Sequence, residues 1–108
     1  NTHEILGSDE IHNMKVGATL INTARGGLVD EPALISALQR GHLRGAGLDV
    51  FAEEPLADGH PLLSLDNVIL SPHVAYNTPD AVKAIFEITV RNICRYFDGE
   101  PINVVAAP

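Results

Sequence analysis

Cysteine, tryptophan and long apolar runs are scarce or absent in this chain of 108 residues. Its one cysteine, Cys94, cannot form an internal disulfide, and its place in an apolar helical stripe predicts a buried, unreactive thiol. No stretch approaches the roughly 18 consecutive apolar residues of a membrane-spanning helix, and the first residues lack the basic start of a signal peptide. We therefore expect a cytoplasmic protein.

Cations are scarce as well, with 7 lysine and arginine residues against 14 aspartate and glutamate residues and a formal net charge of -7. Nucleic-acid surfaces and the surfaces that bind anionic membranes both need clustered cations. The histidines share no short metal-ligand spacing such as His-x-x-x-His, and they are His3, His12, His42, His60 and His73. Nucleic acid, membrane and metal are therefore not expected partners.

The rest of the composition is that of an ordinary folded domain, since 45% of the residues are hydrophobic and 19% are charged. Three short apolar runs, at 18–21, 46–50 and 68–70, have the length of strands in a buried parallel sheet. A strand, a crossover helix and a second strand form a βαβ unit, and the first two runs are spaced for one. The sequence thus predicts an α/β fold with parallel strands and crossover helices.

Capping residues mark the helix between the first two runs. Asp30 is a good N-cap, Glu31 places a negative charge in the first turn, and Gly41 is the expected residue just beyond the last turn. The apolar stripe predicted to be buried consists of Leu34, Ile35 and Leu38. A shorter helical segment is expected over 9–14.

The connection between the second and third runs contains proline and glycine and is too irregular for a crossover helix. Its apolar residues are Leu62, Leu63 and Leu65. We expect all three to pack this connection onto the sheet.

A long C-terminal helix is predicted to begin after Thr78, an N-cap followed by proline, and to end near Gly99. Its apolar stripe is broader than contact with one small sheet requires, and comprises Val82, Ile85, Phe86, Ile88, Val90, Ile93, Tyr96 and Phe97. Because so large an apolar surface needs a cover, self-association into a homo-oligomer is expected of the chain as it stands.

Three chemically distinct side chains follow the three apolar runs: Arg25, Glu54 and His73. Open α/β sheets bind ligands outside the carboxyl ends of their strands. If the strands are parallel neighbours, their loops bring a guanidinium, a carboxylate and an imidazole to one crevice. This arrangement predicts an active site.

The residues around these positions resemble a known family. KVGATLINTARGGLVDE at 15–31, GAGLDVFAEEP at 45–55 and NVILSPHVA at 67–75 are similar to three signatures of the D-isomer-specific 2-hydroxyacid dehydrogenases, in that family's order. The resemblance implies the second half of a Rossmann-like dinucleotide-binding domain over residues 1–76. It also implies that residues 77–108 form a helix and tail returning to a substrate domain outside the chain.

The resemblance assigns roles to the three residues. Arg25 would hold the substrate carboxylate, because a guanidinium binds carboxylates bidentately and stays charged. His73 would protonate the substrate oxygen as hydride arrives, and would take the proton back in the reverse direction. Glu54 would orient the imidazole and favour its charged form. Sequence alone leaves Glu53 as a rival, and alignment to Glu-Pro selects Glu54.

Cofactor contacts are implied in the same way. Asp49 corresponds to the residue that meets the nicotinamide carboxamide, and the loops predicted to line the nicotinamide comprise Thr23, Ala24, Arg25, His73, Val74, Ala75 and Tyr76. Asn1 and Thr2 are a weaker match to a further cofactor loop. No Gly-x-Gly-x-x-Gly motif occurs, since Val50 stands where the third glycine would follow Gly45 and Gly47. The expected cofactor is NAD or NADP, with NAD favoured.

The leading hypothesis is a fragment of an NAD(P)-dependent oxidoreductase acting on a small 2-oxo or 2-hydroxy acid. Tyr76 lies at a position that varies within the family, so it does not assign the substrate. Glyoxylate, hydroxypyruvate, pyruvate and phosphorylated hydroxy acids all stay open, because a domain outside the chain would supply much of the pocket. The isolated chain is expected to be inactive. Two alternatives are a dinucleotide-sensing scaffold resembling the corepressors on this fold and a non-catalytic truncated oligomer.

Overall fold

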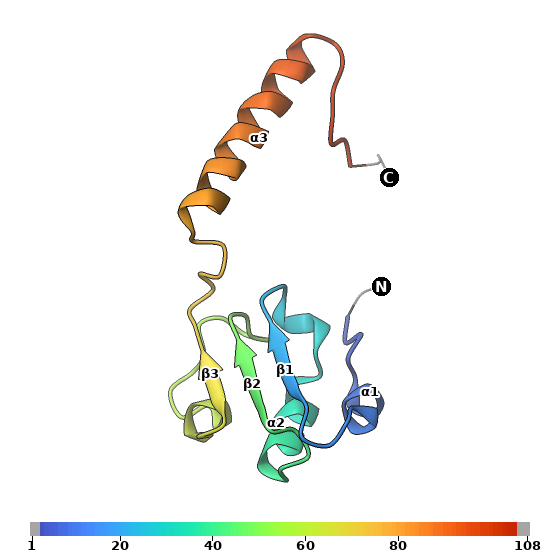
Figure 1. Ribbon diagram of the computed structural model, residues 1–108, viewed down its shortest axis with the longest axis vertical. Coiled ribbons are helices and arrows are strands. Elements are labelled where there is room, and N and C mark those ends of the chain that lie inside the picture. The colour runs from blue at the N-terminus through green and yellow to red at the C-terminus, as the bar shows by residue number, and fades with distance from the viewer. Residues whose placement is uncertain (1–2, 106–108) are drawn as a thin grey trace. The chain divides into compact units, whose positions relative to one another are not determined.

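A computed structural model describes residues 3–105 of the chain (Figure 1). These residues form two compact units, which divide between Ala75 and Tyr76. The weaker cofactor match at Asn1 and Thr2 lies outside the described residues.

The first unit is built on a parallel sheet of three strands, β1 (Thr19–Asn22), β2 (Gly45–Leu48) and β3 (Val68–Leu70), in the order β1-β2-β3. The register places Ile21 opposite Gly47 and Gly47 opposite Ile69. All three strands point the same way (Figure 1), so their carboxyl ends lie along one edge of the sheet. The predicted α/β fold with a parallel sheet is therefore confirmed.

Two helices pack with this sheet, α1 (Ser8–Asn13) and α2 (Glu31–Gln39). The start of α2 follows from its cap, because the Asp30 carboxylate accepts a hydrogen bond from the Ala33 amide at 3.0 Å. Its end follows from Gly41, which adopts a left-handed φ of 69°. The sequence placed both ends of this helix correctly.

The core of the first unit lies on one face of the sheet. The buried cluster joins the strands to both helices through Ile11, Leu20, Leu34, Ala37, Leu38, Leu43, Ala46, Leu48 and Leu62. Of the predicted helix stripe, Leu34 and Leu38 are buried and Ile35 is partly buried. On the other face, Ile21 and Ile69 are 75% and 78% exposed, so this unit covers its sheet on one side only.

The connection from β2 to β3 contains a short 3-10 helix, η2 (Pro61–Ser64). Leu62 is buried and Leu65 packs against the core, as expected. The prediction for Leu63 is wrong, because its side chain is 55% exposed. The tight turn of η2 sends neighbouring side chains in different directions, so Leu62 and Leu63 cannot both face the core.

The second unit is the helix α3 (Pro79–Phe97) with its tail. The Thr78 hydroxyl accepts from the Ala81 amide at 3.2 Å, and Gly99 adopts a φ of 78° just beyond the helix, so both predicted ends are confirmed. The prediction of a buried Cys94 is wrong, since this residue is exposed. A single helix with a short tail cannot enclose a side chain, and no residue of α3 is buried in the part of the chain that is described. None of the described helices is long and apolar enough to cross a membrane.

Candidate active site

The candidate site lies at the carboxyl edge of the sheet, entirely within the first unit. Residues 23–25 follow β1, residues 49–54 follow β2 and residues 71–75 follow β3. Parallel neighbouring strands place these three loops side by side, which is where ligands bind in open α/β sheets. Arg25, Glu54 and His73 each lie in one of these loops.

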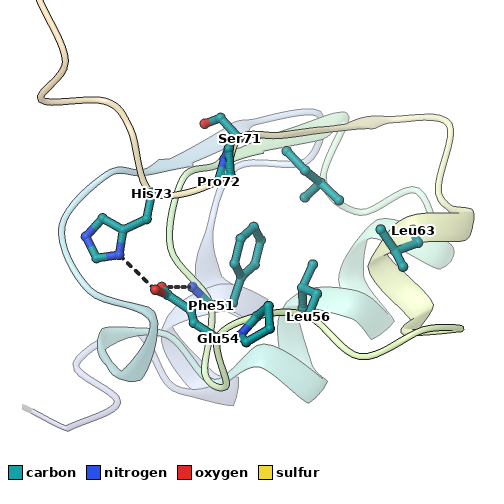
Figure 2. A pocket seen from close by; sticks show the side chains of 9 residues that line it. Phe51, Glu54, Leu56, Leu63, Ser71, Pro72 and His73 are labelled. Atoms are coloured by element: carbon teal, nitrogen blue, oxygen red, sulfur yellow. Dashed lines mark hydrogen bonds and ion pairs between the residues drawn. The ribbon is translucent and has the colours of Figure 1, made fainter.

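His73 and Glu54 are in direct contact. The imidazole Nδ1 lies 2.8 Å from Glu54 Oε2, and Figure 2 shows the ring pointing at the carboxylate. A carboxylate can only accept, so Nδ1 carries the hydrogen of this bond and Nε2 is left for another partner. The pair is partly open to solvent.

The Glu54 carboxylate is fixed from its other side by its own loop. Its Oε1 accepts a hydrogen bond from the Phe51 amide at 3.0 Å (Figure 2). The His73 hydrogen bond first, and then the Phe51 amide, hold the pKa of Glu54 below its usual value, with a smaller contribution from the charge of Arg25. Glu54 is therefore ionised at neutral pH, and its negative charge faces the imidazole.

Asp49 is buried directly after β2 and organises the loop that carries His73. Its Oδ1 accepts from the Ser71 hydroxyl at 2.5 Å and from the Val74 amide at 2.9 Å, and its Oδ2 accepts from the Ala75 amide at 2.8 Å. The Ser71 hydrogen bond is the main cause that lowers the pKa of Asp49, against the opposing effect of burial. These three donors offset the desolvation of a buried carboxylate.

His73 adopts a left-handed backbone conformation, with φ of 55°. This region disfavours a residue with a Cβ by roughly 1–2 kcal/mol. The two residues after His73 are held in place, because the Val74 and Ala75 amides donate hydrogen bonds to Asp49. Asp49, directly after β2, thereby fixes the orientation of His73. Local strain of this kind is typical of functional sites.

The loop that carries Arg25 is held by two devices. The buried Asn22 side chain accepts from the Ala24 amide at 3.1 Å and donates to the Arg25 carbonyl at 2.9 Å. Gly26 then lies so close to the next loop that an added Cβ would be 1.8 Å from the Phe51 carbonyl oxygen. Arg25 itself is exposed, and its guanidinium donates to the Ala24 carbonyl at 2.6 Å.

A pocket of about 490 Å³ opens beside the His73–Glu54 pair. Apart from these two residues and Ser71 its lining is apolar, and consists of Phe51, Pro55, Leu56, Leu63, Leu70 and Pro72 (Figure 2). The exposed Leu63 thus forms part of the pocket wall.

The structure brings Glu54, His73, Asp49, Val74 and Ala75 together through hydrogen bonds. Thr23 and Ala24 lie in the exposed loop after β1, next to Arg25, while Tyr76 is exposed and begins the second unit. Glu53, the rival of Glu54, is exposed.

Sequence reasoning missed two residues that hold this site, Asn22 and Ser71. Asn22 is the last residue of β1, and an asparagine there can bond to the amide two residues on, as Asx turns do. Ser71 follows β3 directly, as Asp49 follows β2, so a donor for the buried carboxylate could have been sought there. Both signals were present in the sequence as polar residues at strand ends.

Comparison with known proteins agrees with this geometry. A sequence model described as D-isomer specific 2-hydroxyacid dehydrogenase, NAD binding domain, matches residues 1–75. The chain is 45% identical over 109 residues to glycerate dehydrogenase of Methylorubrum extorquens, covering 99% of this chain and 35% of that protein.

The chain is also similar in structure to solved dehydrogenases and reductases. An NADPH-dependent glyoxylate/hydroxypyruvate reductase from Sinorhizobium meliloti superposes with a TM-score of 0.85 at 40% identity, covering 98% of this chain and 34% of that one. D-lactate dehydrogenase with NAD+ from Lactobacillus jensenii superposes with a TM-score of 0.79 at 34% identity, covering 99% of this chain and 36% of that one.

The parallel sheet, with a candidate site at the carboxyl ends of its strands, thus defines a Rossmann-like fold of the nucleotide-binding type. More particularly, the chain belongs to the D-isomer specific 2-hydroxyacid dehydrogenase family, as part of its NAD-binding domain. It spans about a third of the length of these relatives.

Proposed function

We propose that this chain is the catalytic half-site of an NAD(P)-dependent D-2-hydroxyacid dehydrogenase that interconverts a small 2-oxo acid and its 2-hydroxy acid. The observation that carries the proposal is the 2.8 Å contact between His73 Nδ1 and Glu54 Oε2, at the sheet edge where the Arg25 loop also lies. A cytoplasmic location is part of the same proposal.

His73 acts as the general acid for reduction. Its Nδ1–H is engaged by Glu54, so Nε2 is the atom that gives a proton to the substrate carbonyl oxygen and recovers it in the reverse reaction. The ionised Glu54 stabilises the imidazolium before the proton is given and holds the ring in one orientation. The bound dinucleotide supplies the hydride.

Arg25 provides the fixed cation for the substrate carboxylate. Its guanidinium is exposed, and among residues 3–105 the one hydrogen bond it donates is to the Ala24 carbonyl. A bidentate pair would orient the 2-oxo acid, because two parallel hydrogen bonds fix a carboxylate plane. Orientation of the carbonyl beside His73 then follows from the fixed positions of the two loops.

The residues that would hold the nicotinamide end of NAD or NADP are the exposed loop Thr23–Ala24–Arg25 and the segment His73–Val74–Ala75–Tyr76, with Asp49 behind it. The loops fit this group because they lie at the carboxyl edge of a parallel sheet. The motif that cradles a pyrophosphate is not in this sequence. We therefore propose that the rest of a longer protein completes the cofactor site, and that the 108-residue chain alone does not turn over.

Steady-state kinetics of the longer protein with NADH or NADPH tests this proposal, with pyruvate, glyoxylate and hydroxypyruvate as substrates. Turnover of at least one 2-oxo acid is expected. An Arg25→Lys variant should raise KM for that acid about tenfold, equivalent to about 1.4 kcal/mol, because an ammonium cannot bind bidentately. Arg40→Lys, at the exposed end of α2, is the matched control. Tight NAD(H) binding with no turnover would instead support the sensing scaffold.

We also propose that the 108-residue chain self-associates through α3. Large side chains exposed on this helix include Ile85, Phe86, Val90, Ile93 and Phe97, and such a surface is rarely left free on a monomer. Light scattering at several concentrations should show a mass above that of the monomer, and a clean monomer throughout would refute the proposal.

A further inference from the structure

One carboxylate outside the site holds both ends of the loop that carries Glu54. Glu31, the first residue of α2, accepts a hydrogen bond from the Ala52 amide through Oε2 at 3.2 Å. Its Oε1 lies 3.3 Å from His60 Nε2. Ala52 and His60 enclose the segment in which Glu54 lies, so a single side chain of α2 fixes that segment at two points.

The His60 imidazole is held at both of its nitrogens. Its Nδ1 accepts a hydrogen bond from the Leu62 amide at 3.3 Å, which caps η2. In the neutral ring the hydrogen is then on Nε2, which lies 3.3 Å from Glu31 Oε1. Only about a fifth of the His60 side chain and about a seventh of the Glu31 side chain are exposed, so solvent screens this contact less than a surface pair.

The hydrogen bond between Glu31 and the Ala52 amide affects Glu54 through the neighbouring residue Phe51. Ala52 directly follows Phe51, whose amide donates to Glu54 Oε1 and whose carbonyl abuts Gly26. Fixing the Ala52 amide therefore restrains the neighbouring peptide unit, whose Phe51 amide gives Glu54 one of its hydrogen bonds. Glu54 in turn touches His73.

We propose that Glu31 and His60 are positioning residues that set the Glu54 carboxylate for its contact with His73. The proposal rests on the proposed function only in that the His73–Glu54 pair is taken to be catalytic. Neither residue touches the imidazole of His73, and both act through the loop between Ala52 and His60.

The test is the carboxyl titration of Glu54 in the 108-residue chain, followed by carbon-13 NMR. The groups that face Glu54 are His73, Arg25 and the Phe51 amide. Glu31→Gln removes one of the two contacts of Glu31, because an amide has a single acceptor oxygen. If Glu31 positions Glu54, its loss weakens the hydrogen bonds to Glu54, and the pKa of Glu54 rises from its lowered value.

Glu53→Gln is the matched control, since it removes the same charge from an exposed position of the same loop. Loss of a nearby negative charge by itself lowers the pKa of Glu54, so positioning and charge act in opposite directions. A pKa of Glu54 in Glu31→Gln that is no higher than its pKa in Glu53→Gln would overturn the proposal. An equal rise in Glu53→Gln would overturn it too.

His60→Asn decides the matter if Glu31→Gln does not fold. The shorter amide can still accept from the Leu62 amide but cannot reach Glu31, so the pKa of Glu54 should again rise, and an unchanged titration would refute the role of His60. In the longer protein, both variants should lower kcat/KM about tenfold, as loss of such supporting contacts does. An inactive wild-type protein would refute the proposed function and leave the NMR result standing.

Discussion

Replacement of His73 by alanine in the longer protein should lower kcat by about 10²–10⁴-fold and leave KM for the 2-oxo acid largely unchanged. Under the proposed function, the variant lacks the proton donor at Nε2 but keeps Arg25 as the group that binds the substrate carboxylate. Steady-state kinetics in both directions provides the measurement, because the same group gives the proton in reduction and takes it in oxidation.

His12→Ala is the control for this prediction. His12 is an exposed residue on α1, which lies away from the carboxyl ends of the strands (Figure 1). Its removal should leave kcat within about twofold of wild type. Full activity of His73→Ala would show that His73 is not the proton donor. A large loss in both variants would point to damage to the fold instead.

Replacement of Gly26 by alanine should lower the free energy of unfolding by about 3 kcal/mol, at the upper end of ordinary overpacking. The new methyl group would lie 1.8 Å from the Phe51 carbonyl oxygen and 2.6 Å from the Ala52 amide nitrogen. These are backbone atoms and cannot rotate away, so one of the two loops must move. Chemical unfolding of the 108-residue chain measures the change.

Gly27→Ala is a closely matched control, since it adds the same methyl group one residue later. Its Cβ would lie 3.6 Å from the nearest atom, on the His3 ring, which is ordinary contact. We expect a change within about 0.5 kcal/mol for this variant. If Gly26→Ala were as stable as Gly27→Ala, the close approach of the two loops would not exist in solution.

Local signals predicted most of the fold because they act within a few residues. Asp30 and Gly41 mark α2, and Thr78 and Gly99 mark α3, through hydrogen bonds and backbone angles that depend on near neighbours. Burial is different, because it depends on what packs from outside an element. Cys94 was misjudged for that reason, since an apolar stripe does not reveal whether a cover is present.

The candidate site could be predicted in part. The order of three parallel strands was enough to bring Glu54 and His73 to one edge, where the structure places them in contact. Other bonds that hold the loops join a carboxylate to a backbone amide far along the chain, such as Asp49 to the Val74 amide and Glu31 to the Ala52 amide. No residue pattern identifies so distant a partner amide, so these contacts needed the structure.

Of the three donors that bond to Asp49, the one furthest along the chain is Ala75, the last residue of the first unit. Every contact described for the His73–Glu54 pair therefore lies on the amino-terminal side of position 76. A recombination site between Ala75 and Tyr76 would therefore keep all of these contacts within one segment. Exchange of residues 1–75 between homologous dehydrogenases would thus transfer the His73–Glu54 pair with its contacts, while the helix and tail would come from the recipient protein.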